Sequence, residues 1–184
     1  VMAEGSATLV LESYEAAKAR GAKILGVVRG TGERADTFHR TRSKPDGSAI
    51  IDTINRSMAD AGMQPGDIDY INAHGTSTPE NDKMEYLALS EALGSALDNT
   101  PISSNKSMIG HTLSAAGTIE AAISLLTIHA GTLPPTINCH EQDPNILMDV
   151  VPNVKKEKAV NTVMSNSFGF GGQNVCLIFS NEPG

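Results

Sequence analysis

The sequence predicts a layered α/β fold, in which helices and strands alternate as α-β-α-β-α before a closing pair of strands. Segment 48–62 places apolar residues at helical spacing, and segment 114–130 is apolar nearly all round. Short runs rich in Val and Ile lie between and after them, and Gly or Pro separates the segments. This alternation is typical of proteins in which helices cover a sheet.

In the first third of the chain, apolar and Ala-rich runs predict short elements around a polar loop. Ser48 is expected to cap the first long helix, in which Ile51, Ile54 and Met58 recur on one face before Gly62 ends it. The elements expected before it are a strand at 7–11, a helix at 14–20, a strand at 24–28 and a loop at 33–47.

The remaining elements place polar residues at strand ends, where ligands collect in α/β proteins. The helix 114–130 has almost no charged face, so we expect it to be sandwiched between two layers. The other elements expected are a strand at 68–73 before His74, a helix from its cap Asp82 to about 93, a strand at 102–104 before Asn105 and Lys106, an extended connection at 134–158, and antiparallel strands at 160–164 and 175–179.

Composition and charge argue against several classes of protein. The net charge of −7 argues against a surface for nucleic acid. Four basic residues nevertheless gather near the polar loop, where the simplest interpretation is a solvated surface: Arg34, Arg40, Arg42 and Lys44. The apolar stretch 113–133 carries Glu120 and His129, so it favours a buried helix and no membrane span.

The two cysteines and the opening residues favour a cytoplasmic protein. Cys139 and Cys176 lack the spacing of metal ligands, and two free thiols fit a reducing compartment. Cys176 lies in an apolar run and is expected to be buried and structural. Cys139 is next to His140, but adjacent side chains rarely face each other as nucleophile and base. Val1–Gly5 lacks the features of a signal peptide and resembles the middle of a protein.

Two histidines lie beside glycine at predicted element ends. His74 precedes Gly75, and His111 follows Gly110 just before the apolar helix. A helix N-terminus disfavours imidazolium, so His111 should be neutral and able to donate a hydrogen bond. Two neutral rings aimed at one point would stabilise a developing oxyanion. Structural, hydrogen-bonded histidines and a pair of zinc ligands are the alternatives, although no third ligand is evident.

Glu120 lies on the apolar helix, where an unpaired carboxylate would be costly. Lys106, which follows the predicted strand before that helix, is the nearest credible partner. The two would form a buried ion pair, and the same pair could orient His111.

The segment Phe168–Gly172 contains too much glycine for an ordinary strand. A phosphate-binding loop is disfavoured, because neither a helix nor the Gly-Lys-Ser/Thr pattern follows. Close packing against a ligand or a second loop fits better. Phe168 and Phe170 could line an acyl pocket or simply fill the core.

Three motifs together carry a family resemblance: Asn72–Thr78 (NAHGTST), Lys106–His111 (KSMIGH) and Ser165–Gly172 (SNSFGFGG). In order and spacing the chain resembles, over nearly its whole length, the β-ketoacyl-acyl carrier protein synthases of the thiolase-like superfamily. The type II elongating synthases are the most similar branch. The resemblance implies a fold of two βαβαβαββ halves stacked as α-β-α-β-α layers. Residues 1–38 would then be the closing strands of the first half, and residues 39–184 the complete second half.

The resemblance also implies the chemistry, a decarboxylative Claisen condensation between malonyl-acyl carrier protein and an acyl group held on a cysteine. That cysteine belongs to the first half, and no position here matches it. The implied partners are acyl carrier protein and a second copy in a homodimer, with no metal and no resident cofactor, because the substrate carries phosphopantetheine. This chain alone is expected to be inactive and to expose apolar surface.

By the same resemblance, ten residues receive roles. His74 and His111 would hold the malonyl thioester oxygen, with Lys106 and Glu120 as the supporting pair of the catalytic set. The substrate-binding positions are Thr76 and Thr78 for the phosphopantetheine arm, Phe170 for the acyl oxyanion hole and the gate of the pocket, Phe168 as its companion, and His39 and Thr41 near the malonyl carboxylate.

The chain departs from the elongating synthases at two positions. Ile109 stands where they commonly have Thr, and Gln173 also replaces a common Thr. Ile at the first position is frequent in polyketide ketosynthases, so the subclass stays open. A polyketide-type ketosynthase and a non-catalytic partner similar to chain-length factors are the alternatives. The Thr-Ser-Thr-Pro run from Thr76 favours fatty-acid synthesis.

Overall fold

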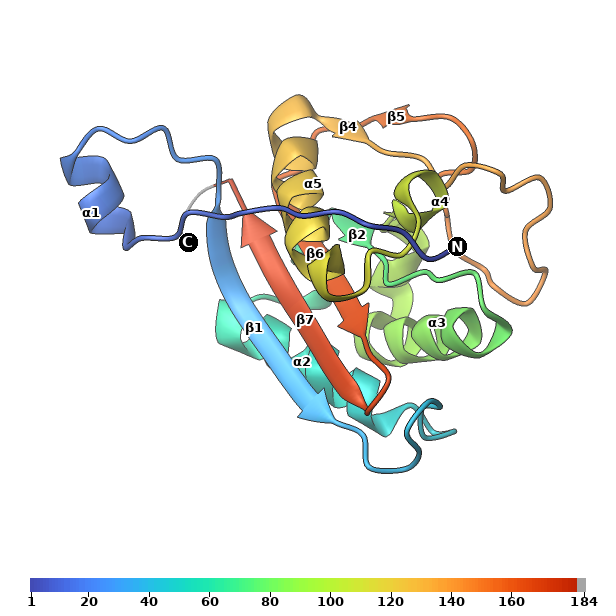
Figure 1. Ribbon diagram of the computed structural model, residues 1–184. Coiled ribbons are helices and arrows are strands. Elements are labelled where there is room, and N and C mark those ends of the chain that lie inside the picture. Colours follow the sequence, from blue (N-terminus) through green and yellow to red (C-terminus); the bar gives the residue numbers. More distant parts are fainter. Residues whose placement is uncertain (182–184) are drawn as a thin grey trace.

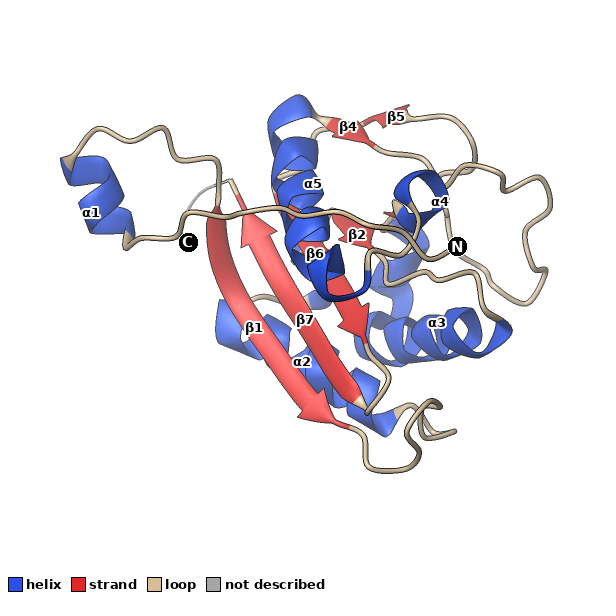
Figure 2. Cartoon of the chain, in the orientation of Figure 1, coloured by secondary structure: helices blue, strands red, loops and turns tan. Residues whose placement is uncertain are grey.

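A computed structural model describes residues 1–181 and confirms the α/β class, with one mixed sheet between helices (Figures 1 and 2). The sheet has five strands in the order β1-β7-β6-β2-β3. β2 is parallel to both β6 and β3, whereas β7 is antiparallel to β6 and β1. The strands are β1 (Val27–Ala35), β2 (Tyr70–Asn72), β3 (Ile102–Ser103), β6 (Thr162–Phe168) and β7 (Gln173–Ser180).

Two helices, α2 (Ser48–Ala61) and α3 (Pro79–Leu93), cover one face of the sheet. α2 packs so closely on β1 that a Cβ at Gly32 would lie 2.0 Å from Thr53 O, and one at Gly30 would lie 2.3 Å from Ser57 O. Only glycine tolerates this contact between a strand and a helix backbone. The main apolar core lies between these two helices and the sheet.

The helix α5 (Ala116–Ala130) lies on the other face of the sheet, over β6 (Figure 1). The shorter elements are α1 (Tyr14–Ala19), α4 (Lys106–Ile109), the two-stranded ribbon of β4 (Thr132–Leu133) and β5 (Lys156–Glu157), and 3-10 helices at Pro65–Asp67, Gly94–Asn99 and Leu113–Ala115. The described chain therefore forms three layers, α–β–α.

Several local predictions are wrong. The strand expected at 7–11 does not form, because this extended segment has no pairing partner among residues 1–181 and a strand needs one. The strand expected at 24–28 begins later, at Val27, and continues to Ala35 through part of the predicted loop.

The two predicted helix caps are also wrong. Gly47 in the left-handed conformation, and not Ser48, precedes α2. Thr78, and not Asp82, caps α3, because its hydroxyl accepts the Asn81 N–H and Pro79 opens the helix.

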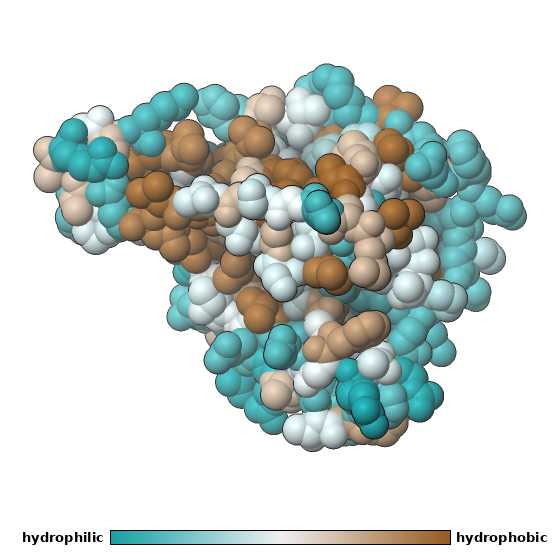
Figure 3. Space-filling view, in the orientation of Figure 1, coloured by the Kyte–Doolittle hydropathy of each residue, from teal (hydrophilic) through white to brown (hydrophobic). Residues whose placement is uncertain are grey.

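The helix α5 is not sandwiched between two full layers as predicted, because its outer side is covered only in part, by chain near Gly5 and Gly26 that approaches Ile119 and Leu125. The side that faces the sheet is partly polar and buries Glu120, Ser124 and Thr127. The outer side is apolar and partly open, with Leu126 62% exposed. Brown apolar surface extends across this part of the molecule in Figure 3. The expectation that the chain exposes apolar surface is therefore confirmed.

By length and composition alone, Leu113–Ala130 could cross a membrane, and it is the one such helix found within residues 1–181. Core helices of soluble proteins pass the same test. Two observations favour a core helix here: Glu120 in its middle is ion-paired with Lys106, and its inner side packs on β6.

Candidate active site

His74 and His111 converge, as predicted from the sequence. Their ring centroids are 5.5 Å apart and the ring planes are nearly perpendicular, at 83°. β2 ends two residues before His74, and α4 ends two residues before His111. The parallel strands β2 and β3 bring these two turns to the same edge of the sheet.

The backbone of His74 is fixed by a buried carboxylate on α3. Glu85 accepts the His74 N–H through Oε1 and the Gly75 N–H through Oε2, both at 2.9 Å. The His74 side chain is 7% exposed, and its ring lies 5.7 Å from that of Phe168. Burial, with Lys106 and His111 nearby, lowers the pKa of His74 to about 3, so its ring is neutral at physiological pH.

The tautomer of His111 follows from its neighbours. Leu113 N–H donates to Nδ1 over 3.1 Å, so Nδ1 carries no proton and Nε2–H is the ring's donor. Burial and Lys106 lower the pKa of His111 below its usual value, which confirms the predicted neutral state. Desolvation is the largest cause of this shift, followed by the Lys106 ammonium and the amino group of Val1.

The predicted ion pair between Lys106 and Glu120 exists and is buried, with 5% and 2% of the two side chains exposed. Burial raises the pKa of Glu120, and Lys106 opposes the rise. The Lys106 ammonium is close enough to lower the pKa of both histidines. The Lys106 ammonium, paired with Glu120, therefore supplies a fixed positive charge beside the two rings, in agreement with the predicted supporting position of the pair.

The hydroxyls of Thr76 and Thr78 lie 2.8 Å apart in the turn that follows His74. The Thr78 side chain also caps α3. Between them, Ser77 has a φ of 60°, a left-handed conformation that is uncommon for residues other than glycine. Strained backbone of this kind is concentrated at functional sites. Thr78 is exposed and Thr76 partly exposed, so solvent reaches this pair of hydroxyls.

The two phenylalanines of the glycine-rich turn have different surroundings. Phe168 is 9% exposed and contacts the His74 ring, whereas Phe170 is 81% exposed. The turn joins β6 and β7, which confirms the predicted antiparallel pair.

His39 and Thr41 lie on the loop after β1, and Thr41 N–H donates to His39 Nδ1 over 3.1 Å. This loop contacts the glycine-rich turn, because Gly171 N–H donates to Arg40 O and Asp36 N–H donates to Gly172 O, both over 2.7 Å. Within residues 1–181, no ring contact or hydrogen bond joins His39 or Thr41 to either site histidine. Their predicted place near a malonyl carboxylate stays a prediction.

The sequence analysis missed Glu85, which orders the His74 turn. The sequence contains one weak indication of it: Glu85 is a charged residue among Met84, Ala88 and Leu89 on the buried side of α3. Asn166 Nδ2 also donates to Glu85 Oε1 over 3.3 Å, which links β6 to the same carboxylate.

Neither cysteine has the surroundings of a nucleophile. Cys176 is fully buried next to the Ser57 hydroxyl, and burial raises the pKa of its thiol to about 12, which confirms a structural thiol. Cys139 is free and partly buried, and its backbone N–H donates to Asn153. In the described part of the chain, no group of three or more His, Cys, Asp or Glu could hold a metal ion, so His74 and His111 have no third ligand there.

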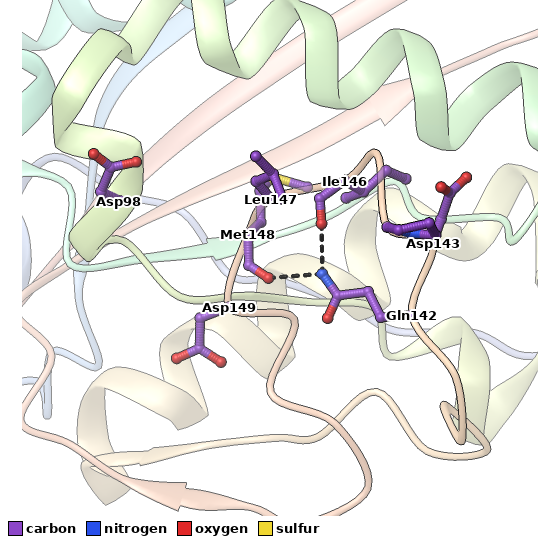
Figure 4. A pocket seen from close by; sticks show the side chains of 8 residues that line it. Asp98, Gln142, Asp143, Ile146, Leu147, Met148 and Asp149 are labelled. Atoms are coloured by element: carbon purple, nitrogen blue, oxygen red, sulfur yellow. Dashed lines mark hydrogen bonds between the residues drawn. The ribbon is translucent and has the colours of Figure 1, made fainter.

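A separate hollow of about 410 Å³ lies between the end of α3 and the loop before β5 (Figure 4). Three carboxylates line it, from Asp98, Asp143 and Asp149, and Gln142 Nε2 ties the loop together by donating to Ile146 O and Met148 O. It contains none of the predicted site residues. The histidine pair therefore remains the candidate site.

Comparison with known proteins gives consistent matches. Residues 25–140 match the family described as "Beta-ketoacyl synthase, C-terminal domain". A 3-oxoacyl-[acyl-carrier-protein] synthase 2 of Coxiella burnetii is 45% identical over 98% of this chain and 44% of its own length. Its counterpart in Synechocystis sp. is 46% identical, over 97% and 43%. The chain spans less than half the length of these curated relatives.

Solved structures give the same result. The structure described as "The ishigamide ketosynthase/chain length factor" has a TM-score of 0.94 and 41% identity. The match covers 99% of this chain and 44% of the chain in that structure. A β-ketoacyl synthase from Burkholderia phymatum has a TM-score of 0.87 and 38% identity, with 93% and 41% covered. These neighbours support the thiolase-like fold predicted from the sequence.

Proposed function

This chain belongs to the β-ketoacyl synthase family, and on that premise we propose that it supplies the two-histidine half of a 3-oxoacyl-acyl carrier protein synthase of fatty acid biosynthesis. The observation that carries the proposal is the pair of neutral imidazoles with ring centroids 5.5 Å apart beside a buried ammonium. In the reaction, a malonyl thioester loses carbon dioxide and its carbon attacks an enzyme-bound acyl thioester.

The bond changes define what the histidines must do. The bond between the malonyl α-carbon and its carboxylate breaks, carbon dioxide leaves, and the electron pair moves onto the thioester oxygen as an enolate. Neutral N–H donors at that oxygen stabilise the charge as it develops, and loss of one such donor costs about 10²–10³ in rate. The enolate carbon then attacks the acyl thioester, and the cysteine sulfur leaves as thiolate.

Neutral rings and the Lys106 potential act together in this scheme. The ammonium that lowers the pKa of both histidines also favours negative charge at the oxygen between them. Glu120 keeps that ammonium in place, and Glu85 keeps the His74 turn in place. These five side chains, His74, His111, Lys106, Glu120 and Glu85, form one electrostatic unit.

The substrate reaches this unit from a carrier protein. We assign the Thr76 and Thr78 hydroxyls to the phosphopantetheine arm, because solvent reaches this pair in the turn that follows His74. The exposed Phe170 would gate the acyl pocket while its N–H completes the acyl oxyanion hole. One solved neighbour, 36% identical, is described as a type II PKS acyl-carrier protein in complex with its ketosynthase, which supports a carrier protein as the class of partner.

The nucleophile would come from the part of the protein that corresponds to the uncovered half of the relatives. Residues 1–38 then close the first thiolase-like half, and 39–184 form the second. We propose a cytoplasmic homodimer without a resident cofactor, since the chemistry uses only side chains and the thioester. A polyketide-type ketosynthase is the second candidate, favoured by the ishigamide neighbour and by Ile109.

The test uses the full-length protein with malonyl- and acyl-carrier protein as substrates. His74→Ala and His111→Ala should each lower decarboxylation and condensation by about 10²–10³. His140→Ala, an exposed histidine on the loop before β5, is the matched control and should keep both rates. Full turnover by either site variant would refute the assignment. Repeated condensations that leave earlier keto groups unreduced would indicate polyketide synthesis, whereas a single 3-oxoacyl product that must be reduced before the next round would indicate fatty-acid synthesis.

A further inference from the structure

The segment Val1–Ala3 lies against His111 as a short parallel β-bridge centred on Met2. His111 N–H donates to Val1 O over 2.8 Å, and Ala3 N–H donates to His111 O over 2.9 Å. Both backbone hydrogen-bonding groups of His111 are thus satisfied by this segment. In Figure 1, the chain starts beside α4 and, after this segment, crosses in front of α5.

Close packing on both sides of His111 accompanies these hydrogen bonds. A Cβ at Gly110, where φ is +74°, would lie 2.8 Å from the Ala3 Cβ. A Cβ at Gly5 would lie 2.9 Å from Ile119 Cδ1 on α5. A side chain at Gly110 would therefore crowd Ala3 in a backbone conformation that favours glycine, whereas at Gly5 the flexible end of Ile119 would have to move.

His111 needs such external support more than His74 does. The Glu85 carboxylate accepts the backbone N–H groups of His74 and Gly75. α4, which precedes His111, is only four residues long, and Gly110 follows it. For His111, the backbone hydrogen bonds to Val1–Ala3 give the support that the Glu85 carboxylate gives to His74.

We propose that Val1–Ala3 is a positioning element, and that the Ala3 N–H sets the place of His111 relative to His74. The inference rests on the proposed function, because positioning matters only if both rings hold one oxygen. A donor displaced by about 1 Å can cost on the order of 10²-fold in rate. The segment touches no reacting atom and acts only through the His111 backbone.

Two substitutions at one position separate the hydrogen bond from the side chain, in the full-length protein. Ala3→Pro removes the N–H, whereas Ala3→Gly keeps it and removes only the Cβ. Decarboxylation of malonyl-carrier protein should fall about 10- to 100-fold in Ala3→Pro, in kcat more than in KM, and stay near the original rate in Ala3→Gly. Transfer of the acyl group onto the cysteine should survive in both, because that step does not use the enolate donors.

A merely structural role would lower acyl transfer and decarboxylation together, and that result would overturn the proposal. So would equal decarboxylation by Ala3→Pro and Ala3→Gly. If His111→Ala also kept its activity, the proposed function itself would fail. If His111→Ala lost activity while Ala3→Pro kept it, the positioning role would be refuted and the proposed function would stand.

A second pair of variants keeps the test decisive should Ala3→Pro not fold. Gly110→Ala would push its new Cβ against the Ala3 Cβ, and decarboxylation should fall. Adding Ala3→Gly to Gly110→Ala removes that contact and should restore part of the rate, although the positive φ still disfavours Ala. No recovery in the double variant would contradict a direct contact between the segment and the His111 turn.

Discussion

The buried pair of Lys106 and Glu120 offers a sharp test of the site's electrostatics. Glu120→Gln keeps the size of the side chain and removes its charge, so the Lys106 ammonium, of which 5% is exposed, loses its counter-ion. Leaving one charge of a buried pair uncompensated costs about 3–5 kcal/mol. Since whole proteins are stable by only about 5–15 kcal/mol, this loss is a large fraction of the total.

The matched control replaces both charges at once. Lys106→Met together with Glu120→Leu removes the pair and leaves no buried charge, so it should be far less destabilising than Glu120→Gln, or neutral. Urea unfolding of the full-length protein, followed by circular dichroism, measures both. A loss below about 1 kcal/mol in Glu120→Gln would refute the reasoning, because it would mean that water reaches the ammonium.

Three further predictions concern the histidine site and the basic loop that contacts the glycine-rich turn. The pKa of folded His74, about 3, lies below its unfolded value of 6.5, so the unfolded chain takes up the proton first as the pH falls. The free energy of unfolding should therefore fall by about 1.4 kcal/mol per pH unit from 6.5 towards 3. Urea unfolding at a series of pH values measures this dependence, which should be weaker in His74→Gln. Thr76→Val with Thr78→Val should raise KM for malonyl-carrier protein more than it lowers kcat; an unchanged KM would remove these hydroxyls from the arm's path. Arg40→Glu with Arg42→Glu should weaken carrier binding and reduce its salt dependence, whereas unchanged binding would leave these arginines as solvated surface.

The sequence indicated the histidine pair because its signals are local. Gly75 and Gly110 mark turns at element ends, and in an α/β sheet such ends meet at one edge. The ion pair of Lys106 with Glu120 was predictable for a similar reason, since a carboxylate on an apolar helix requires a partner.

Features that depend on tertiary contacts were not predictable. Ala7–Leu11 has the composition of a strand but no strand beside it in the described chain. Thr78 became the cap of α3 because the strained turn after His74 places its hydroxyl there. The role of Glu85 depends on two backbone N–H groups from a distant turn, and no pattern within α3 records them.

The reversed polarity of α5 has a consequence for protein engineering. Its inner side carries carboxylate and hydroxyl groups, while Leu126 faces outward. If the proposed function holds and further chain packs on this side of α5, replacing exposed leucines by charged residues to improve expression would disrupt that contact. Solvent exposure within residues 1–181 is therefore a poor guide for choosing such substitutions on α5.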